Sequence, residues 1–150
     1  CERHQTLLIV NDDWRLAAEL GIDAVHLGED DGDIEEARQA LGPGSLIGVS
    51  CYASVERAQA LAPVADYLAF GALFASGTKP LARPAPLSVF REVQALSLAR
   101  PLVGIGGIDA DNIGSVLAAG ADAAAVIGAL FRQGNVRAAA QRLVAAAARP

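Results

Sequence analysis

Residues 7–13 read Leu-Leu-Ile-Val-Asn-Asp-Asp, an apolar run that changes at once into an amide and two carboxylates. A short apolar run with β-branched residues is typical of a buried strand. In α/β folds, ligands bind at the carboxyl ends of the strands, so Asn11 and Asp12 are expected where a substrate or metal is bound. This stretch alone leaves open the alternative that Asn11, Asp12 and Asp13 only cap the following helix.

The rest of the chain alternates short apolar segments with helix-forming segments. Strands are expected at residues 24–28, 46–49, 67–73, 102–105 and 123–127. A helix-forming segment comes after each of them, and the one long irregular segment covers residues 75–86. Strict alternation of apolar strands with helices indicates a parallel sheet covered by helices.

The composition predicts a single domain over residues 1–150 that acts on a small molecule. With 53% hydrophobic residues, the chain is long enough for one core. A net charge of −5 argues against a nucleic-acid partner, and no apolar run approaches the roughly 18 residues of a membrane helix. Cys1 and Cys51 form no C-x-x-C pair, which fits a reducing compartment. A cytoplasmic location is expected, and homo-oligomerisation is left open.

The predicted parallel sheet fits two architectures. A six-stranded doubly wound sheet suits the length, but its usual glycine-rich turn after the first strand is missing from residues 10–13. A (β/α)8 TIM barrel requires two more βα units at the amino end. The barrel is favoured because Gly106, Gly107 and Gly128 follow the last two strands, where barrels often bind phosphate. The alternative interpretation of these glycines is a tight turn from strand to helix.

Charged and hydroxyl side chains at the strand ends predict a metal and an anion. Asp12 and Asp31 follow consecutive strands, and carboxylate oxygens are the ligands that Mg²⁺ selects. Lys79, in the irregular segment, supplies a positive charge, and Ser76 and Thr78 supply hydroxyl groups. An anion with more than one phosphate is therefore expected between the metal and the lysine.

Six short motifs in this order and spacing look like those of thiamine phosphate synthase. They are Val-Asn-Asp, Val-His-Leu-Gly-x-x-Asp, Gly-Val-Ser, Phe-x-x-x-Thr-Lys-Pro, Ile-Gly-Gly-Ile and Ala-Val-Ile, and the similarity covers residues 7–131. The resemblance implies a (β/α)8 barrel that joins hydroxymethylpyrimidine diphosphate to a thiazole phosphate and releases pyrophosphate. The two substrates are small molecules, and the implied cofactor is Mg²⁺.

The resemblance also assigns roles residue by residue. Asn11 resembles the residue that binds the pyrimidine, and Asp12 and Asp31 resemble the Mg²⁺ ligands. Ser50 and Lys79 match positions that contact the pyrimidine diphosphate and are expected to be catalytic. The positions that match contacts to the thiazole phosphate are Ser76, Gly77, Thr78, Gly107, Ile127 and Gly128.

The sequence departs from the family pattern at several points. Glu29 stands where Gln is frequent, Gly77 where Pro is common, and Gly128 where Ser is common. The family's two upstream βα units, with a Gln-x-Arg-x-Lys segment, have no counterpart here. The chain is therefore expected to form strands three to eight, the C-terminal three-quarters of the barrel. The alternatives are a thiazole tautomerase of the same fold and a truncated, non-catalytic phosphate-binding protein.

Other notable side chains are given structural interpretations. His26 is interpreted as a structural histidine rather than an acid or base. Cys51 lies beside Ser50 without an evident base, which favours a small buried thiol over a nucleophile. Trp14 and Tyr67 are interpreted as packing residues.

Overall fold

The computed structural model describes residues 1–75 and 84–148. Six parallel strands form one sheet in sequence order: β1 (Val10–Asn11), β2 (Ala24–Leu27), β3 (Leu46–Tyr52), β4 (Tyr67–Phe70), β5 (Leu102–Ile105) and β6 (Ala123–Ala125). The helices are η1 (Glu2–His4), α1 (Trp14–Glu19), α2 (Ile34–Leu41), α3 (Val55–Leu61), α4 (Ser88–Gln94), α5 (Ile113–Ala118), α6 (Gly128–Phe131) and α7 (Val136–Ala147).

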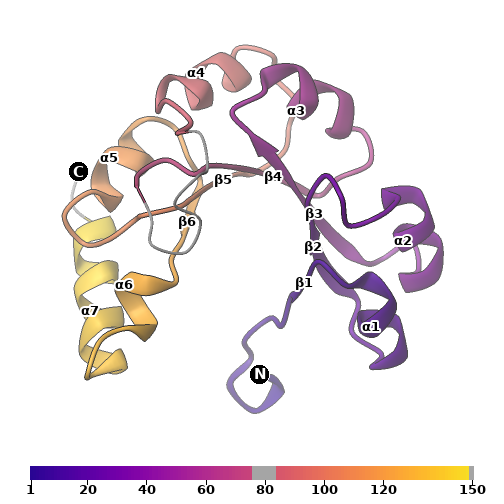
Figure 1. Ribbon diagram of the computed structural model, residues 1–150, viewed down its shortest axis with the longest axis horizontal. Helices are drawn as coiled ribbons and strands as arrows, with labels where there is room; N and C mark the ends of the chain where they lie inside the picture. The colour runs from indigo at the N-terminus through magenta and orange to yellow at the C-terminus, as the bar shows by residue number, and fades with distance from the viewer. Residues whose placement is uncertain (76–83, 149–150) are drawn as a thin grey trace.

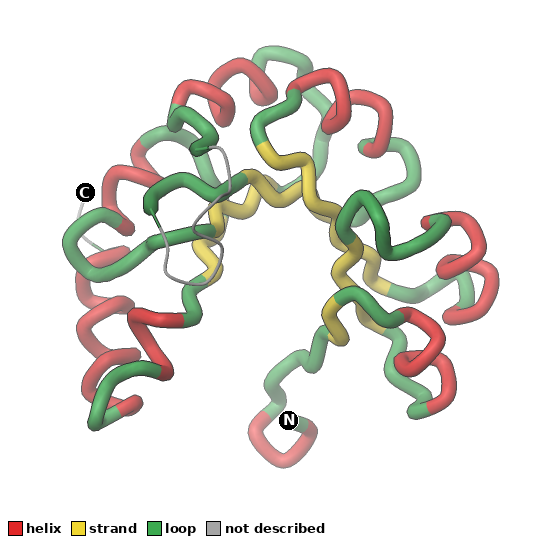
Figure 2. The backbone as a smooth tube through the Cα atoms, in the orientation of Figure 1, coloured by secondary structure: helices red, strands yellow, loops and turns green. Residues whose placement is uncertain are grey.

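The sheet curls into an arc, and the helices lie on its convex side (Figure 1). The backbone trace shows the strands as an inner layer and the helices as an outer layer (Figure 2). Because each strand pairs with the next one in sequence, the strand order never reverses, as it would in a doubly wound sheet. The described residues thus form a curled half-barrel, and the doubly wound alternative is wrong.

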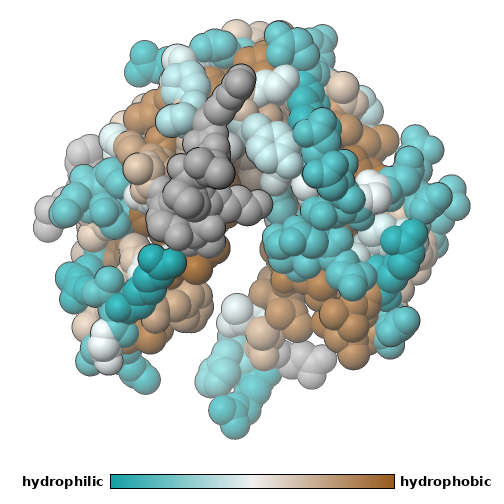
Figure 3. All heavy atoms as spheres, in the orientation of Figure 1, coloured by the Kyte–Doolittle hydropathy of each residue, from teal (hydrophilic) through white to brown (hydrophobic). Residues whose placement is uncertain are grey.

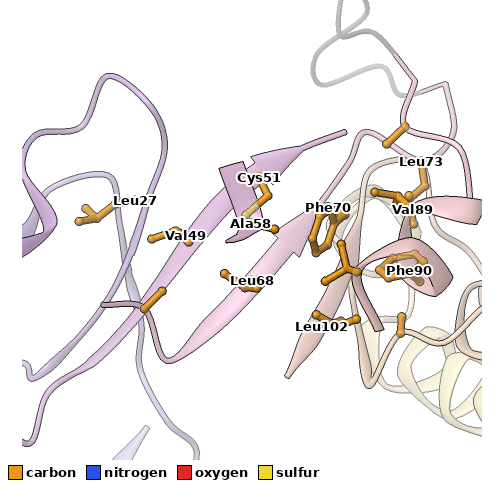
Figure 4. Close-up of a cluster of buried hydrophobic side chains, with 14 of the residues drawn as sticks. Leu27, Val49, Cys51, Ala58, Leu68, Phe70, Leu73, Val89, Phe90 and Leu102 are labelled. Atoms are coloured by element: carbon orange, nitrogen blue, oxygen red, sulfur yellow. The ribbon is translucent and has the colours of Figure 1, made fainter. Parts of the chain in front are cut away.

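The hydrophobic core lies between the convex side of the sheet and the helices. Strand side chains such as Leu27, Val49 and Leu68 are fully buried there, and Figure 4 shows them in one continuous cluster with residues from the helices. The rings of Phe70 and Phe90 pack edge to face with centroids 5.6 Å apart, joining β4 to α4. Among the described helices, none combines the length and apolar character needed to cross a bilayer.

The first strand is shorter than expected. Leu7, Leu8 and Ile9 lie outside β1 and are 59%, 47% and 36% exposed, so the expectation of a buried strand is wrong for them. The physical reason is that β1 lies at the edge of the sheet and pairs only with β2 within the described residues. The space-filling view shows the concave side open between this edge and the α6–α7 side (Figure 3).

Four further strand boundaries differ from the expectation. Strand β2 ends at Leu27 rather than at residue 28. Strand β4 ends at Phe70 rather than at residue 73, and β6 ends at Ala125 rather than at residue 127. Strand β3 continues to Tyr52, with an irregularity between Ser50 and Tyr52. The short helix α6 follows β6 at once, where no helix is expected from the sequence.

Aspartates hold the amino ends of the strands in register. The Asp66 carboxylate, directly before β4, accepts hydrogen bonds from the Ile47 backbone N–H and the Arg38 guanidinium, both at 2.7 Å. Arg38 also donates to the backbone carbonyls of Ser45 and Val64. Asp122, directly before β6, accepts a hydrogen bond from the Leu102 N–H at 2.7 Å. Together these contacts fix where neighbouring strands begin.

We predict that Asp66→Ala lowers the free energy of unfolding by about 2 kcal/mol, because it leaves the buried Ile47 N–H and the Arg38 guanidinium without their acceptor. Denaturant unfolding measures this change. Asp23→Ala is the matched control, since Asp23 precedes β2 in the same way, while its carboxylate has no hydrogen bond within the described residues. Equal stability of the two variants would contradict the prediction.

Candidate functional site

Four residues from neighbouring strands form one row across the concave face of the sheet. The strand register places Asn11 beside His26, His26 beside Gly48, and Gly48 beside Tyr67. Paired residues in a parallel sheet share a face, and side chains alternate between faces along a strand. Since the alternate side chains of β2 and β3 are packed in the core, this row and Ser50, two residues beyond Gly48, face the concave side.

His26 links two of these strands through both of its ring nitrogens. Its Nδ1 lies 2.9 Å from the Tyr67 hydroxyl, and its Nε2 lies 2.9 Å from Ser50 Oγ. Burial lowers the pKa of His26, and the charge of Asp31 opposes this only in part. Burial also raises the pKa of Tyr67. At neutral pH the network is therefore uncharged, with a neutral imidazole between two hydroxyl groups.

The two aspartates in the turn after β1, Asp12 and Asp13, have different conformations and contacts. Asp13 caps α1, because its Oδ1 accepts a hydrogen bond from the Leu16 N–H at 2.9 Å. Asp12 has a φ of +71°, a left-handed conformation that Asp tolerates better than most residues, and its N–H donates to the His26 carbonyl at 2.8 Å. The side-chain cap is thus provided by Asp13, and the binding roles expected of Asn11 and Asp12 stay predictions.

The turn after β2 holds Asp31 in a fixed position. Its Oδ2 accepts a hydrogen bond from the Gly28 N–H at 2.6 Å. A Cβ atom at position 28 would lie 2.8 Å from the same oxygen, so a larger residue there would displace the Asp31 carboxylate. The Tyr52 hydroxyl, from the end of β3, accepts a hydrogen bond from the Glu29 N–H at 3.2 Å. A contact from the neighbouring strand therefore steadies the turn that carries Asp31.

Asp12 and Asp31 follow the ends of adjacent strands, as expected from the sequence. Within residues 1–75 and 84–148, no group of three or more His, Cys, Asp or Glu side chains could hold a metal ion. Mg²⁺ is usually bound by one or two carboxylates together with phosphate oxygens and waters, so a pair of hard carboxylates has the donor chemistry that such a site needs. Their role as metal ligands stays a prediction.

The glycines after β5 make a tight turn. Gly106 and Gly107 have φ values of +99° and +64°. A Cβ atom at Gly107 would lie 2.6 Å from the Ala75 carbonyl oxygen, so the close approach to the chain after β4 requires glycine. This supports the interpretation as a strand-to-helix turn, and the contact of Gly107 with phosphate stays a prediction.

Only some of the other residues that are expected to contact phosphate lie within the described part of the chain. Ile127 is 54% exposed after β6, and Gly128 begins α6. Both lie beyond the carboxyl end of their strand, the same side of the sheet as Asp12 and Asp31. The expected site residues Ser76, Gly77, Thr78 and Lys79 lie outside the described residues.

Cys51 is fully buried, and burial raises the pKa of its thiol to about 11. The interpretation as a buried structural thiol is confirmed, because a thiol with this pKa is not ionised at neutral pH. Sequence reasoning missed the contact between Tyr67 and His26, 41 positions apart. The one sequence feature that could have indicated this contact is Gly48, which has no side chain although its neighbours in β3 are bulky.

We predict that Asp13→Ala lowers the free energy of unfolding by about 1 kcal/mol, because it removes the side-chain acceptor for the Leu16 N–H. Asp13→Asn should keep most of that stability, since Asn caps helices about as well as Asp. Thermal or denaturant unfolding of the two variants provides the measurement. A loss of similar size in both would show that charge, rather than capping, accounts for the effect.

Comparisons with known proteins agree on one family. A family profile described as thiamine monophosphate synthase matches residues 1–130. The chain is 52% identical over 143 residues to a thiamine-phosphate synthase of Methylobacillus flagellatus, covering 95% of this chain and 68% of the relative. It is 54% identical over 144 residues to one of Chromobacterium violaceum, covering 95% and 69%.

Solved structures give the same result. A thiamine phosphate pyrophosphorylase from Pyrococcus furiosus matches with a TM-score of 0.85 and 35% identity, over 97% of this chain and 69% of that one. A 3-hexulose-6-phosphate synthase matches with a TM-score of 0.71 at 21% identity, which shows a shared fold alone. The chain therefore belongs to the thiamine monophosphate synthase family.

Proposed function

We propose that this protein joins hydroxymethylpyrimidine diphosphate to a thiazole phosphate, giving thiamine phosphate and pyrophosphate. The proposal rests on the polar side chains at the carboxyl ends of β1, β2 and β3, in a chain more than half identical to thiamine-phosphate synthases. The protein is thus a transferase of thiamine biosynthesis.

The reaction requires no protein nucleophile. The bond between the pyrimidine methylene carbon and the diphosphate oxygen breaks, and its electron pair leaves with pyrophosphate. The thiazole nitrogen then uses its lone pair to form the new C–N bond to that carbon. No proton has to be removed by the protein in either step. An uncharged histidine network and a protonated Cys51 thiol are consistent with such chemistry.

The protein's tasks are to position the substrates and to stabilise the leaving group. We assign Asn11 and Ser50 to the pyrimidine diphosphate, because both face the concave side near the strand ends. Asp12 and Asp31 would hold Mg²⁺, which supplies positive charge to offset the charge that develops on pyrophosphate. Lys79, outside the described residues, would add a further positive charge.

The thiazole phosphate is assigned to the other half of the arc. Gly107 after β5, and Ile127 and Gly128 after β6, lie on the carboxyl side of the sheet, and Ser76, Gly77 and Thr78 complete the proposed set. The nitrogen of the thiazole would then face the pyrimidine methylene across the concave side. In this arrangement each substrate is bound by a different group of strands, and proximity supplies much of the acceleration.

We further propose that the curled sheet belongs to an eight-stranded barrel. The chain spans about two thirds of the length of its relatives, and the six strands curl without closing. Exposed apolar side chains at the two open sides, such as Leu7 and Phe131, are the kind of surface that further barrel units would cover. A cytoplasmic location remains a proposal from the composition, and homo-oligomerisation stays open.

A thiazole tautomerase of the same family would need only the thiazole-phosphate half of this site. The retention of Asn11, Asp12 and Asp31 at the pyrimidine half favours the synthase. A truncated protein that only binds phosphate would bind the substrates without forming a product. Formation of thiamine phosphate from both substrates therefore separates the synthase from the other two alternatives.

We predict that the full-length protein forms thiamine phosphate from both substrates with Mg²⁺, and that Asp31→Asn lowers kcat/KM by about 100-fold. The asparagine can still accept the Gly28 N–H, so the turn is retained while the charge is lost. Asp30→Asn is the matched control: Asp30 is the exposed neighbour of Asp31 and should keep activity within about twofold.

Two results would contradict the proposal. One is the absence of thiamine phosphate when the unmodified full-length protein is supplied with both substrates and Mg²⁺. The other is equal activity of Asp31→Asn and Asp30→Asn, which would leave the synthase activity standing but remove Asp31 from the metal site.

A further inference from the structure

We propose that Tyr67 acts through His26 to hold the Ser50 hydroxyl as a hydrogen-bond donor toward the substrate. In this arrangement His26 and Tyr67 are positioning residues, and Ser50 makes the contact. The inference rests on the proposed function, because it describes how Ser50 meets the pyrimidine diphosphate. It predicts that the group facing Ser50 is an acceptor, either a pyrimidine ring nitrogen or a diphosphate oxygen.

The strand register alone brings Tyr67 to His26. The two residues lie on β4 and β2, with Gly48 of β3 between them in the same row. A Cβ atom at position 48 would lie 1.8 Å from Cζ of Tyr67, so the tyrosine occupies the space that a side chain there would fill. The Tyr67 ring therefore crosses β3 and stacks near His26, with ring centroids 5.5 Å apart and an angle of 22° between the planes.

The two hydrogen bonds of His26 are coupled by its single ring proton. A neutral imidazole has one N–H donor and one acceptor nitrogen, so one hydroxyl group must donate to it and the other must accept from it. The Tyr67 hydroxyl and Ser50 Oγ each lie 2.9 Å from one of the two ring nitrogens, so both hydrogen bonds depend on where that one proton sits. The choice of which nitrogen carries the proton decides what Ser50 can offer to a ligand.

Tyr67 determines which ring nitrogen of His26 carries the proton. Its hydroxyl is part-buried, and His26 is its hydrogen-bond partner among side chains on the concave face. Both hydroxyl groups lie 2.9 Å from the ring, but the phenol O–H of Tyr67 is a stronger hydrogen-bond donor than the alcohol O–H of Ser50, so Tyr67 donates to Nδ1. The proton of His26 must then be on Nε2, where it is donated to Ser50 Oγ 2.9 Å away.

The consequence lies at Ser50. Because its oxygen accepts the His26 proton, its own O–H is free to rotate toward a ligand, and it presents a donor. With the opposite tautomer, Ser50 would donate to Nε2 and could present only lone pairs. The network thus selects an acceptor on the substrate and disfavours a donor at the same point, since a mismatched buried pair leaves a polar group unsatisfied.

The tautomer can be measured without substrate. ¹⁵N NMR of the histidine rings in the full-length protein should show the proton of His26 fixed on Nε2. Tyr67→Phe, which keeps the ring but removes the hydroxyl, should abolish that preference, and Gly48→Ala should act in the same direction by displacing Tyr67. Exposed His4, the other histidine of the sequence, serves as the internal control. A proton on Nδ1 in the unmodified protein would overturn the inference.

A double-mutant cycle tests whether Tyr67 works through Ser50. Tyr67→Phe should lower kcat/KM for thiamine phosphate formation by about tenfold in the unmodified background, but by less than about twofold in the Ser50→Ala background. Equal losses in both backgrounds would mean that Tyr67 has only a structural role. If the unmodified protein forms no thiamine phosphate, the proposed function fails, whereas the NMR result still decides the hydrogen-bond arrangement.

Discussion

The parallel register of the first four strands is the constraint on which the rest of the structure depends. It places Asn11, His26, Gly48 and Tyr67 in one row and directs that row to the concave side. A slip of one residue in any pair would turn the side chains of that strand to the opposite face. The same register brings the ends of β1 and β2 together, so that Asp12 and Asp31 follow adjacent strands.

Residues at the amino ends of the strands and residues at their carboxyl ends have different roles. At the amino ends, Asp66 and Asp122 bind backbone N–H groups of neighbouring strands and hold the register. At the carboxyl ends, Asp31 and Ser50 are held by the Gly28 N–H and by His26. In parallel α/β barrels, residues at the amino ends of the strands usually serve stability, and residues at the carboxyl ends serve the chemistry. Changes that weaken one end need not alter the other.

The sequence was sufficient to predict the alternation of strands and helices, the parallel sheet, and the strand ends that carry Asn11, Asp12 and Asp31. Periodicity and polarity are local properties, and these features depend on little else. The sequence could not decide which aspartate caps α1, because Asp12 and Asp13 are equally good capping residues until the backbone conformation is known. Nor could it reveal that Leu7, Leu8 and Ile9 are exposed, since an apolar run reads the same at an edge as inside a sheet. The contact of Tyr67 with His26 depends on register across three strands, which spacing along the chain does not contain.

The most direct test of the central claim is a crystal structure of the full-length protein with hydroxymethylpyrimidine diphosphate and Mg²⁺. The diphosphate should lie at the carboxyl ends of β1 and β2, with carboxylate oxygens of Asp12 and Asp31 on the metal and Ser50 Oγ within hydrogen-bond distance of a substrate acceptor. The alternative place for a ligand is a hollow of about 380 Å³ near the amino ends, lined in part by Glu35, Arg38, Asp66 and Arg100. Diphosphate bound in that hollow, with the concave carboxyl side left empty, would contradict the account.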